Sequence, residues 1–216
     1  MSAGNEMKVS GHVQELVANP TPLGLLGLAM VTLVASTQKL GITSGVAYII
    51  PWAIFLGATA QFIAGIMDFK HNNTFGATAF CGYGFFWFAV GTTWWMQTSG
   101  LIGKGEGFDA HQLGFAFLGY FIFTVFMTIG AMGTNKVLWL IFFLIDLLFL
   151  GLFMSTLGWG AEHFWHQLAA YSEMGIAICS FYLSGAVCIN TQYGYKVLPI
   201  GDPFGPFYRK SVALRG

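Results

Sequence analysis

Long apolar runs separated by short polar segments dominate the pattern along the chain. Six of these runs approach or exceed the roughly 20 apolar residues that a helix needs to cross the core of a bilayer. Acidic and basic side chains are nearly absent from them. The pattern therefore predicts an all-α polytopic membrane protein with six transmembrane helices, over residues 22–40, 45–67, 75–97, 112–133, 137–158 and 173–192.

The polar segments divide the chain into a tail over 1–18, a six-helix domain over 19–201 and a second tail over 202–216. Segment 159–171 mixes tryptophans with charged residues and histidines, which predicts a short amphipathic stretch at the membrane interface. Ser172 and Glu173 follow it, and they are expected to cap the last helix and to complement its dipole.

Lysines and arginines are distributed unevenly between the two sides of the predicted bundle. With the N-terminus in the cytoplasm, only Lys39 and Lys104 fall outside, and the other seven fall inside. The positive-inside rule therefore predicts that both termini are cytoplasmic and that the chain is a multi-pass protein of the cell membrane. The seven are Lys8, Lys70, Lys136, Lys196, Arg209, Lys210 and Arg215.

Composition excludes several other classes of protein. Charged residues make up 8% of the chain and the formal net charge is zero, so nothing favours nucleic-acid binding. The three cysteines match no metal motif and are interpreted as packing residues. His163 and His166 are spaced to share a helix face, but two ligands are weak support for a metal site, and an exposed interfacial pair is the simpler interpretation. No nucleophile–base pair is visible in the spans, so we expect neither an enzyme nor a cofactor.

The first helix begins in an unusual way. Its start reads Asn19-Pro20-Thr21-Pro22-Leu23-Gly24-Leu25. Prolines are tolerated in the first turn of a helix, and Asn19 is a good N-cap residue. Free amides and the positive end of the helix dipole attract anions, so this start is a candidate anion-binding motif.

Two polar side chains lie within predicted spans. Asp146 is either a protonation site beside a permeation route or a hydrogen-bonded lock between two helices, because a mid-membrane carboxyl is costly unless it faces an interior. Gln61 is either a polar contact in a pore or an interhelical hydrogen bond. The sequence leaves both choices open.

Aromatic side chains crowd one part of the third span. The run over 82–88 places Tyr83 between two glycines and follows it with Phe86 and Trp87. Bulky rings next to glycines are typical of a narrow apolar constriction, although plain packing surface is the more common role of such rings. Tyr83 is the strongest candidate to line a pore.

Four motifs together resemble the acetate uptake transporter family, also called the succinate–acetate permease or GPR1/FUN34/YaaH family. The segment over 19–25 is similar to the family signature Asn-Pro-Ala-Pro-Leu-Gly-Leu and differs only at Thr21. The other three runs that carry the resemblance are residues 73–80, 83–87 and 197–201.

The resemblance implies transport of acetate and related short carboxylates, in some members succinate, by a homohexamer with one pore in each protomer. It also implies an apolar neck at Leu28, Tyr83 and Ile145, where Leu28 replaces the usual Phe. Polar groups along the route would come from Asn19, Thr21, Asn73, Thr74 and Thr78, since the span interiors contain no Lys or Arg.

Alternatives stay open at this stage. The chain could act as an anion channel or as a symporter that carries protons through Asp146. A channel for urea or short amides is the nearest rival. A non-transporting membrane sensor of pH or solute is a rival from another class.

Overall fold

The computed structural model describes residues 17–103 and 107–204, and these form α-helices joined by short connections. Most of both predicted tails lies outside the described residues, and so does the segment over 104–106. Five of the counted basic residues fall there: Lys8, Lys104, Arg209, Lys210 and Arg215. The helices are α1 (Thr21–Lys39), α2 (Ile49–Pro51), η1 (Trp52–Ala58), α3 (Thr59–Lys70), α4 (Thr74–Thr98), α5 (His111–Ala131), α6 (Lys136–Thr156) and α7 (Glu162–Tyr193).

Five helical segments are long and apolar enough to cross a membrane: Thr21–Lys39, Ile49–Lys70, His111–Ala131, Lys136–Thr156 and Glu162–Tyr193. The helix α4 has 25 residues and lies in the same bundle, but its glycine, threonine and tryptophan residues lower its hydropathy. The membrane-protein prediction is therefore confirmed, whereas the count of six spans and the sidedness of the termini stay predictions.

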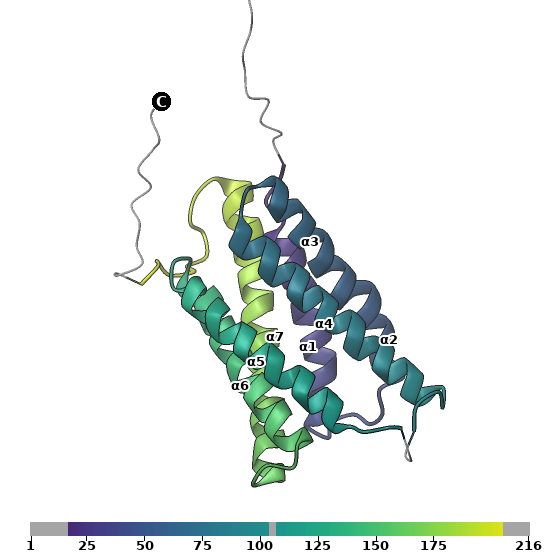
Figure 1. Cartoon of the computed structure of the whole chain (residues 1–216). Coiled ribbons are helices and arrows are strands. Elements are labelled where there is room, and N and C mark those ends of the chain that lie inside the picture. Colours follow the sequence, from purple (N-terminus) through teal and green to yellow (C-terminus); the bar gives the residue numbers. More distant parts are fainter. Residues whose placement is uncertain (1–16, 104–106, 205–216) are drawn as a thin grey trace, which may run out of the picture.

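The helices follow one another around a ring. Their packing gives the order α1, α3, α4, α5, α6 and α7, with α7 against α1 closing the ring (Figure 1). The contact between α4 and α5 is the weakest of these neighbours. The first and last described residues lie at the same end, where the Val137 amide donates to the Ile200 carbonyl and His71 contacts the Ala18 carbonyl. We call this the terminal end and the opposite one the loop end.

The second predicted span has an internal change of helix type. Its helix begins at Ile49 rather than at residue 45, and η1 within it is a seven-residue π-helical segment. Glycine lets α4 approach this segment closely, because a Cβ at Gly84 would lie 3.0 Å from the Ala58 carbonyl oxygen and 3.0 Å from the Phe62 amide nitrogen. Such segments are frequent at functional sites.

The last helix corrects one prediction. The structure shows no break between the expected interfacial stretch and the last span, because α7 runs continuously over 32 residues. Ser172 and Glu173 therefore lie inside a helix and cap nothing. Both are buried, with Glu173 only 1% exposed. The charge of this carboxylate is therefore balanced by a partner on another helix and not by the dipole of its own helix.

Candidate functional site

Two cavities lie inside the ring, one toward each end. The terminal cavity has a volume of about 570 Å³ and is lined by α1, α3, α4 and α6, together with Gly130 near the end of α5, the α5–α6 connection, Val187 of α7 and Ile200. The loop cavity has a volume of about 200 Å³ and is lined from the opposite ends of α1, α4, α5, α6 and α7. The two cavities approach each other in the middle of the bundle.

The start of α1 lines the terminal cavity, but without free amides. The Thr21 amide donates to Asn19 Oδ1 at 3.0 Å, and the Leu23 and Gly24 amides both donate to the Pro20 carbonyl. Pro20 is the N-cap residue, and neither proline carries an N–H. The expected set of bare amides is therefore wrong for this first turn.

The seven residues of the motif have different surroundings. The cavity is lined by Asn19, Thr21 and Leu25, whereas the Pro22 carbonyl accepts a hydrogen bond from Ser184 on α7 and Gly24 packs against Phe80. Leu23 is exposed. The motif thus anchors the helix with one set of residues and lines the cavity with another.

Three helix N-termini converge on the terminal cavity. Asn73 caps α4 by accepting from the Gly76 amide at 3.1 Å, and Asn135 caps α6 by accepting from the Leu138 amide at 2.9 Å. Both asparagines line the cavity, as does the start of α1. The positive ends of three helix dipoles therefore favour a negative charge in this cavity.

Asp68 is a cavity residue that sequence reasoning missed. Its side chain is buried at the end of α3, accepts a side-chain hydrogen bond from Asn73, and keeps one oxygen, Oδ2, without a hydrogen-bond partner. Gly76 makes room for it, because a Cβ there would collide with Oδ2. The available signal was a lone acidic residue at the end of an apolar run, followed five residues later by an asparagine.

Gln61 lies two helical turns before Asp68 on α3 and also lines the terminal cavity. Its Nε2 donates to the Gly57 carbonyl of its own helix at 2.9 Å, and its Oε1 has no partner. The amide therefore contacts the cavity and makes no interhelical bond. Thr74 and Thr78 do not join it, because both occupy the exposed face of α4.

The residues of the predicted constriction lie between the two cavities. Leu28, Tyr83 and Ile145 line the terminal cavity, and all three are nearly fully buried. Phe86 and Trp87 line the loop cavity from the next turn of α4. We call these five residues the plug.

The plug is thinnest along α4 and α6. On α4 the lining changes from one cavity to the other between Tyr83 and Phe86, and on α6 it changes between Ile145 and Leu148. Three residues of helix rise by about 4.5 Å. On α4 and α6 one helical turn therefore separates the two linings, whereas on α1 the lining of the terminal cavity ends at Leu28 and that of the loop cavity begins at Gln38.

The hydroxyl of Tyr83 is already engaged. It lies 2.9 Å from Thr124 Oγ1, and that hydroxyl in turn donates to the Tyr120 carbonyl at 2.7 Å. Because Thr124 uses its only proton in this way, Tyr83 must be the donor to Thr124. The Tyr83 ring is stacked with Phe149 at a centroid distance of 6.4 Å, so the residue presents a fixed ring rather than a free hydroxyl proton.

Asp146 lies apart from both cavity linings. Its Oδ2 accepts a hydrogen bond of 2.6 Å from Thr128 on α5, while Oδ1 is buried without a partner. This geometry matches a lock between α5 and α6, which was one of the two predicted roles. A role in proton transfer stays a prediction.

Charged groups gather instead at the loop cavity. Lys39, the last residue of α1, donates to Glu173 Oε2 at 2.8 Å, and both line the cavity together with His166. His163 and His166 are exposed. Within residues 17–103 and 107–204, no group of three or more His, Cys, Asp or Glu side chains comes together as metal ligands would.

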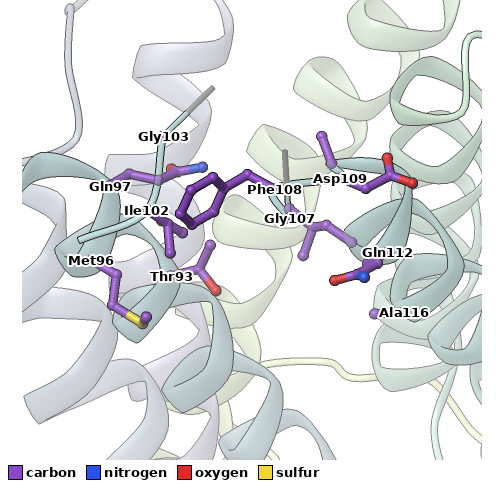
Figure 2. Close-up of a pocket in the computed structure, with 12 residues that line it drawn as sticks. Thr93, Met96, Gln97, Ile102, Gly103, Gly107, Phe108, Asp109, Gln112 and Ala116 are labelled. Atoms are coloured by element: carbon purple, nitrogen blue, oxygen red, sulfur yellow. The ribbon is translucent and has the colours of Figure 1, made fainter. Parts of the chain in front are cut away.

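A larger pocket of about 740 Å³ lies outside the ring, between α4, α5 and the connecting loop at the loop end. Figure 2 shows Phe108 reaching across it toward Thr93 and Ile102. Asp109 also lines this pocket, and its carboxylate accepts a hydrogen bond from the His111 amide at 2.9 Å and contacts the His111 ring. These hydrogen bonds hold the pKa of Asp109 below its ordinary value. This pocket shares Thr93 and Leu113 with the lining of the loop cavity, so it adjoins that cavity where α4 and α5 are in weakest contact.

A ring of apolar helices with a cavity at each end and an apolar plug between them defines a membrane transport protein. The chain belongs to the GPR1/FUN34/yaaH family, whose model matches residues 4–202. The family prediction is therefore confirmed.

Individual relatives agree with this assignment. The chain is 34% identical over 189 residues to the succinate-acetate/proton symporter SatP of Escherichia coli, covering 86% of this chain and 96% of that one. It is 35% identical to acetate permease A of Emericella nidulans, covering 62% of this chain and 47% of that one. The structure of the bacterial acetate channel SatP superimposes with a TM-score of 0.79 at 33% identity, covering 86% of this chain and all of that one.

Proposed function

We propose that the protein carries acetate and related short-chain carboxylates across the cytoplasmic membrane, through the two cavities and the plug between them. The observation that carries the proposal is the convergence of three helix N-termini on a cavity whose floor is an apolar barrier, one turn thick on α4 and α6. The names of the relatives point to the same substrates.

The chemistry of the route fits a small amphipathic anion. In the terminal cavity, positive helix ends and amide side chains hold a carboxylate without a salt bridge, and conduction needs binding that is weak enough to reverse. The apolar plug then accepts the methyl end of acetate and penalises hydrated inorganic ions. In our proposal the terminal cavity faces the cytoplasm, as the distribution of Lys and Arg predicts.

Uptake of labelled acetate into proteoliposomes tests this proposal. We expect saturable uptake that unlabelled acetate inhibits and urea does not. Leu28→Trp should reduce uptake to the level of protein-free vesicles, because the indole fills the plug. The matched control is Leu26→Trp, at a position 38% exposed on the outside of the same helix, which should leave uptake intact. Inhibition of acetate uptake by urea would favour a channel for urea or short amides. A wild-type protein that shows no acetate uptake would favour the non-transporting sensor.

We also propose that protomers assemble as a homohexamer, each with its own pore. The outer faces of the helices carry large apolar side chains, such as Phe55 at 77% exposure and Phe126 at 65%, which need either lipid or a neighbouring subunit. Mass measurement of the detergent-solubilised protein by light scattering tests the hexamer, and a monomeric mass would contradict it.

A further inference from the structure

The loop cavity contains a buried ion pair. Lys39 Nζ and Glu173 Oε2 are 2.8 Å apart, with side chains exposed by only 13% and 2%. They join the end of α1 to the interior of α7 and form part of the cavity wall. The pair is therefore placed where a solute approaching the plug from the loop end would meet it.

Stability alone does not explain this pair. Two charges lose their hydration when they are buried, and apolar side chains of similar size often stabilise a protein as well or better. The rest of the cavity wall shows that apolar side chains fit there, because Val90, Phe117 and Leu152 belong to it. A charged pair beside a cavity is thus a candidate for function.

The geometry leaves the ammonium group able to bind a second acceptor. Lys39 has three N–H donors, and its hydrogen bond to Glu173 uses one of them. Hydroxyl and amide side chains of Gln38, Thr93, Ser155 and Thr156 also line the cavity. A carboxylate entering this cavity would find one cation and several neutral hydrogen-bonding groups.

Charge balance limits what can happen next. Among the described residues that line the cavity, the ionisable groups are Lys39, Glu173 and the exposed His166; α4, α5 and α6 contribute none. Asp146, on the neighbouring α6, bonds to α5 instead. A solute carboxylate beside Glu173 would therefore place two negative charges on one ammonium group, and like charges at this distance repel strongly.

Resting on the proposed function, we propose that the carboxylate of the transported acid replaces Glu173 on Lys39, and that Glu173 takes up a proton from the aqueous side in the same step. The ammonium group exchanges one carboxylate for another, and the proton neutralises the one that is displaced. When the acid leaves Lys39 toward the plug, Glu173 returns its proton to the departing carboxylate, the acid crosses the plug in its neutral form, and the Lys39–Glu173 pair re-forms. The pair thus links each bound anion to one proton.

Acetate uptake into proteoliposomes, measured with and without an inward pH gradient, tests this exchange. Wild type should be stimulated by the gradient. Glu173→Gln keeps the shape and an acceptor for Lys39 but cannot be protonated, so its uptake should no longer respond to the gradient. Glu162→Gln is the matched control, since it makes the same change at an exposed position of the same helix, and it should respond as wild type does.

A second variant tests the role of the cation. Lys39→Met should raise the KM for acetate by about tenfold or more, because a charge-assisted hydrogen bond to the substrate is lost. Lys39→Arg should recover most of the affinity. A KM unchanged in Lys39→Met would overturn the proposal.

Infrared difference spectra supply a readout that does not depend on flux. Adding acetate to the purified protein should produce the C=O stretch of one protonated carboxylic acid, and Glu173→Gln should lack it. A band that persists in this variant, or a gradient response that persists in its uptake, would overturn the exchange. Absence of acetate uptake by wild type would instead overturn the proposed function itself.

Discussion

In the proposed route, the two cavities offer opposite means of receiving the same kind of solute. The terminal cavity is large and contains a buried carboxylate, Asp68, with helix N-termini and asparagine side chains around it. The loop cavity is smaller and contains a cation, Lys39, already paired with an anion. Helix dipoles at the terminal cavity favour an anion only weakly. At the loop cavity the Lys39 ammonium group can exchange one carboxylate partner for another. In the proposed route, weak anion binding therefore occurs at one end and proton exchange at the other.

The largest expected effect comes from joining the cavities. Tyr83→Ala removes a buried ring and should lower the free energy of unfolding by about 3–5 kcal/mol. It should also raise uptake of bulky carboxylates, such as benzoate, relative to acetate. Thermal denaturation and competition uptake measure the two effects. Tyr83→Phe keeps the ring and loses only the hydrogen bond to Thr124, so it should still favour acetate over benzoate as wild type does. If Tyr83→Ala also favoured acetate to the same extent as wild type, the barrier would lie elsewhere.

An intermediate effect is expected from crowding the terminal cavity alone. Gly76→Ala places a methyl group on Asp68 Oδ2 and should destabilise the protein by about 1–3 kcal/mol while lowering acetate uptake. Gly119→Ala is the control, because a Cβ at this helical position meets no atom within 4 Å. It should be neutral or stabilising. If Gly76→Ala and Gly119→Ala have the same stability and the same acetate uptake, the space that Gly76 leaves for Asp68 is not needed for either property.

The smallest expected effect concerns charge at the terminal cavity. Asp68→Asn removes a negative charge facing the helix N-termini and keeps an acceptor for Asn73. Acetate should bind more tightly from this side, with KM falling by about two- to tenfold, and the response to a pH gradient should persist. Efflux kinetics from loaded vesicles measure KM. The control Asp202→Asn alters an exposed carboxylate paired with Lys196, and its KM should not change.

The helices themselves were largely predictable from the apolar runs. The predicted spans 112–133 and 137–158 correspond to α5 and α6 within two residues at each end, because short polar connections flank continuous apolar sequence. The start of α7 was missed because the charged and histidine residues over 159–171 resemble an interfacial segment. Length and hydropathy indicate that a helix is present, but not where a partly polar one begins.

The site was less predictable than the fold. Tyr83 was indicated by its flanking glycines, and resemblance to a family added Leu28 and Ile145 as its partners at a constriction; all three line the terminal cavity. Asp68 and the pair Lys39–Glu173 were missed because their importance depends on contacts between helices. Lys39 and Glu173 are 134 residues apart in the chain, and no local pattern indicates that they meet.

The thinness of the plug has an electrical consequence. When water fills both cavities, nearly all of the membrane potential falls across the plug between them. An acetate anion that crosses the plug alone performs electrical work of about 2.3 kcal/mol for each 100 mV. An acetate that crosses with its proton performs none. The current that accompanies each transported molecule therefore distinguishes a channel for the anion from a carrier of the neutral acid.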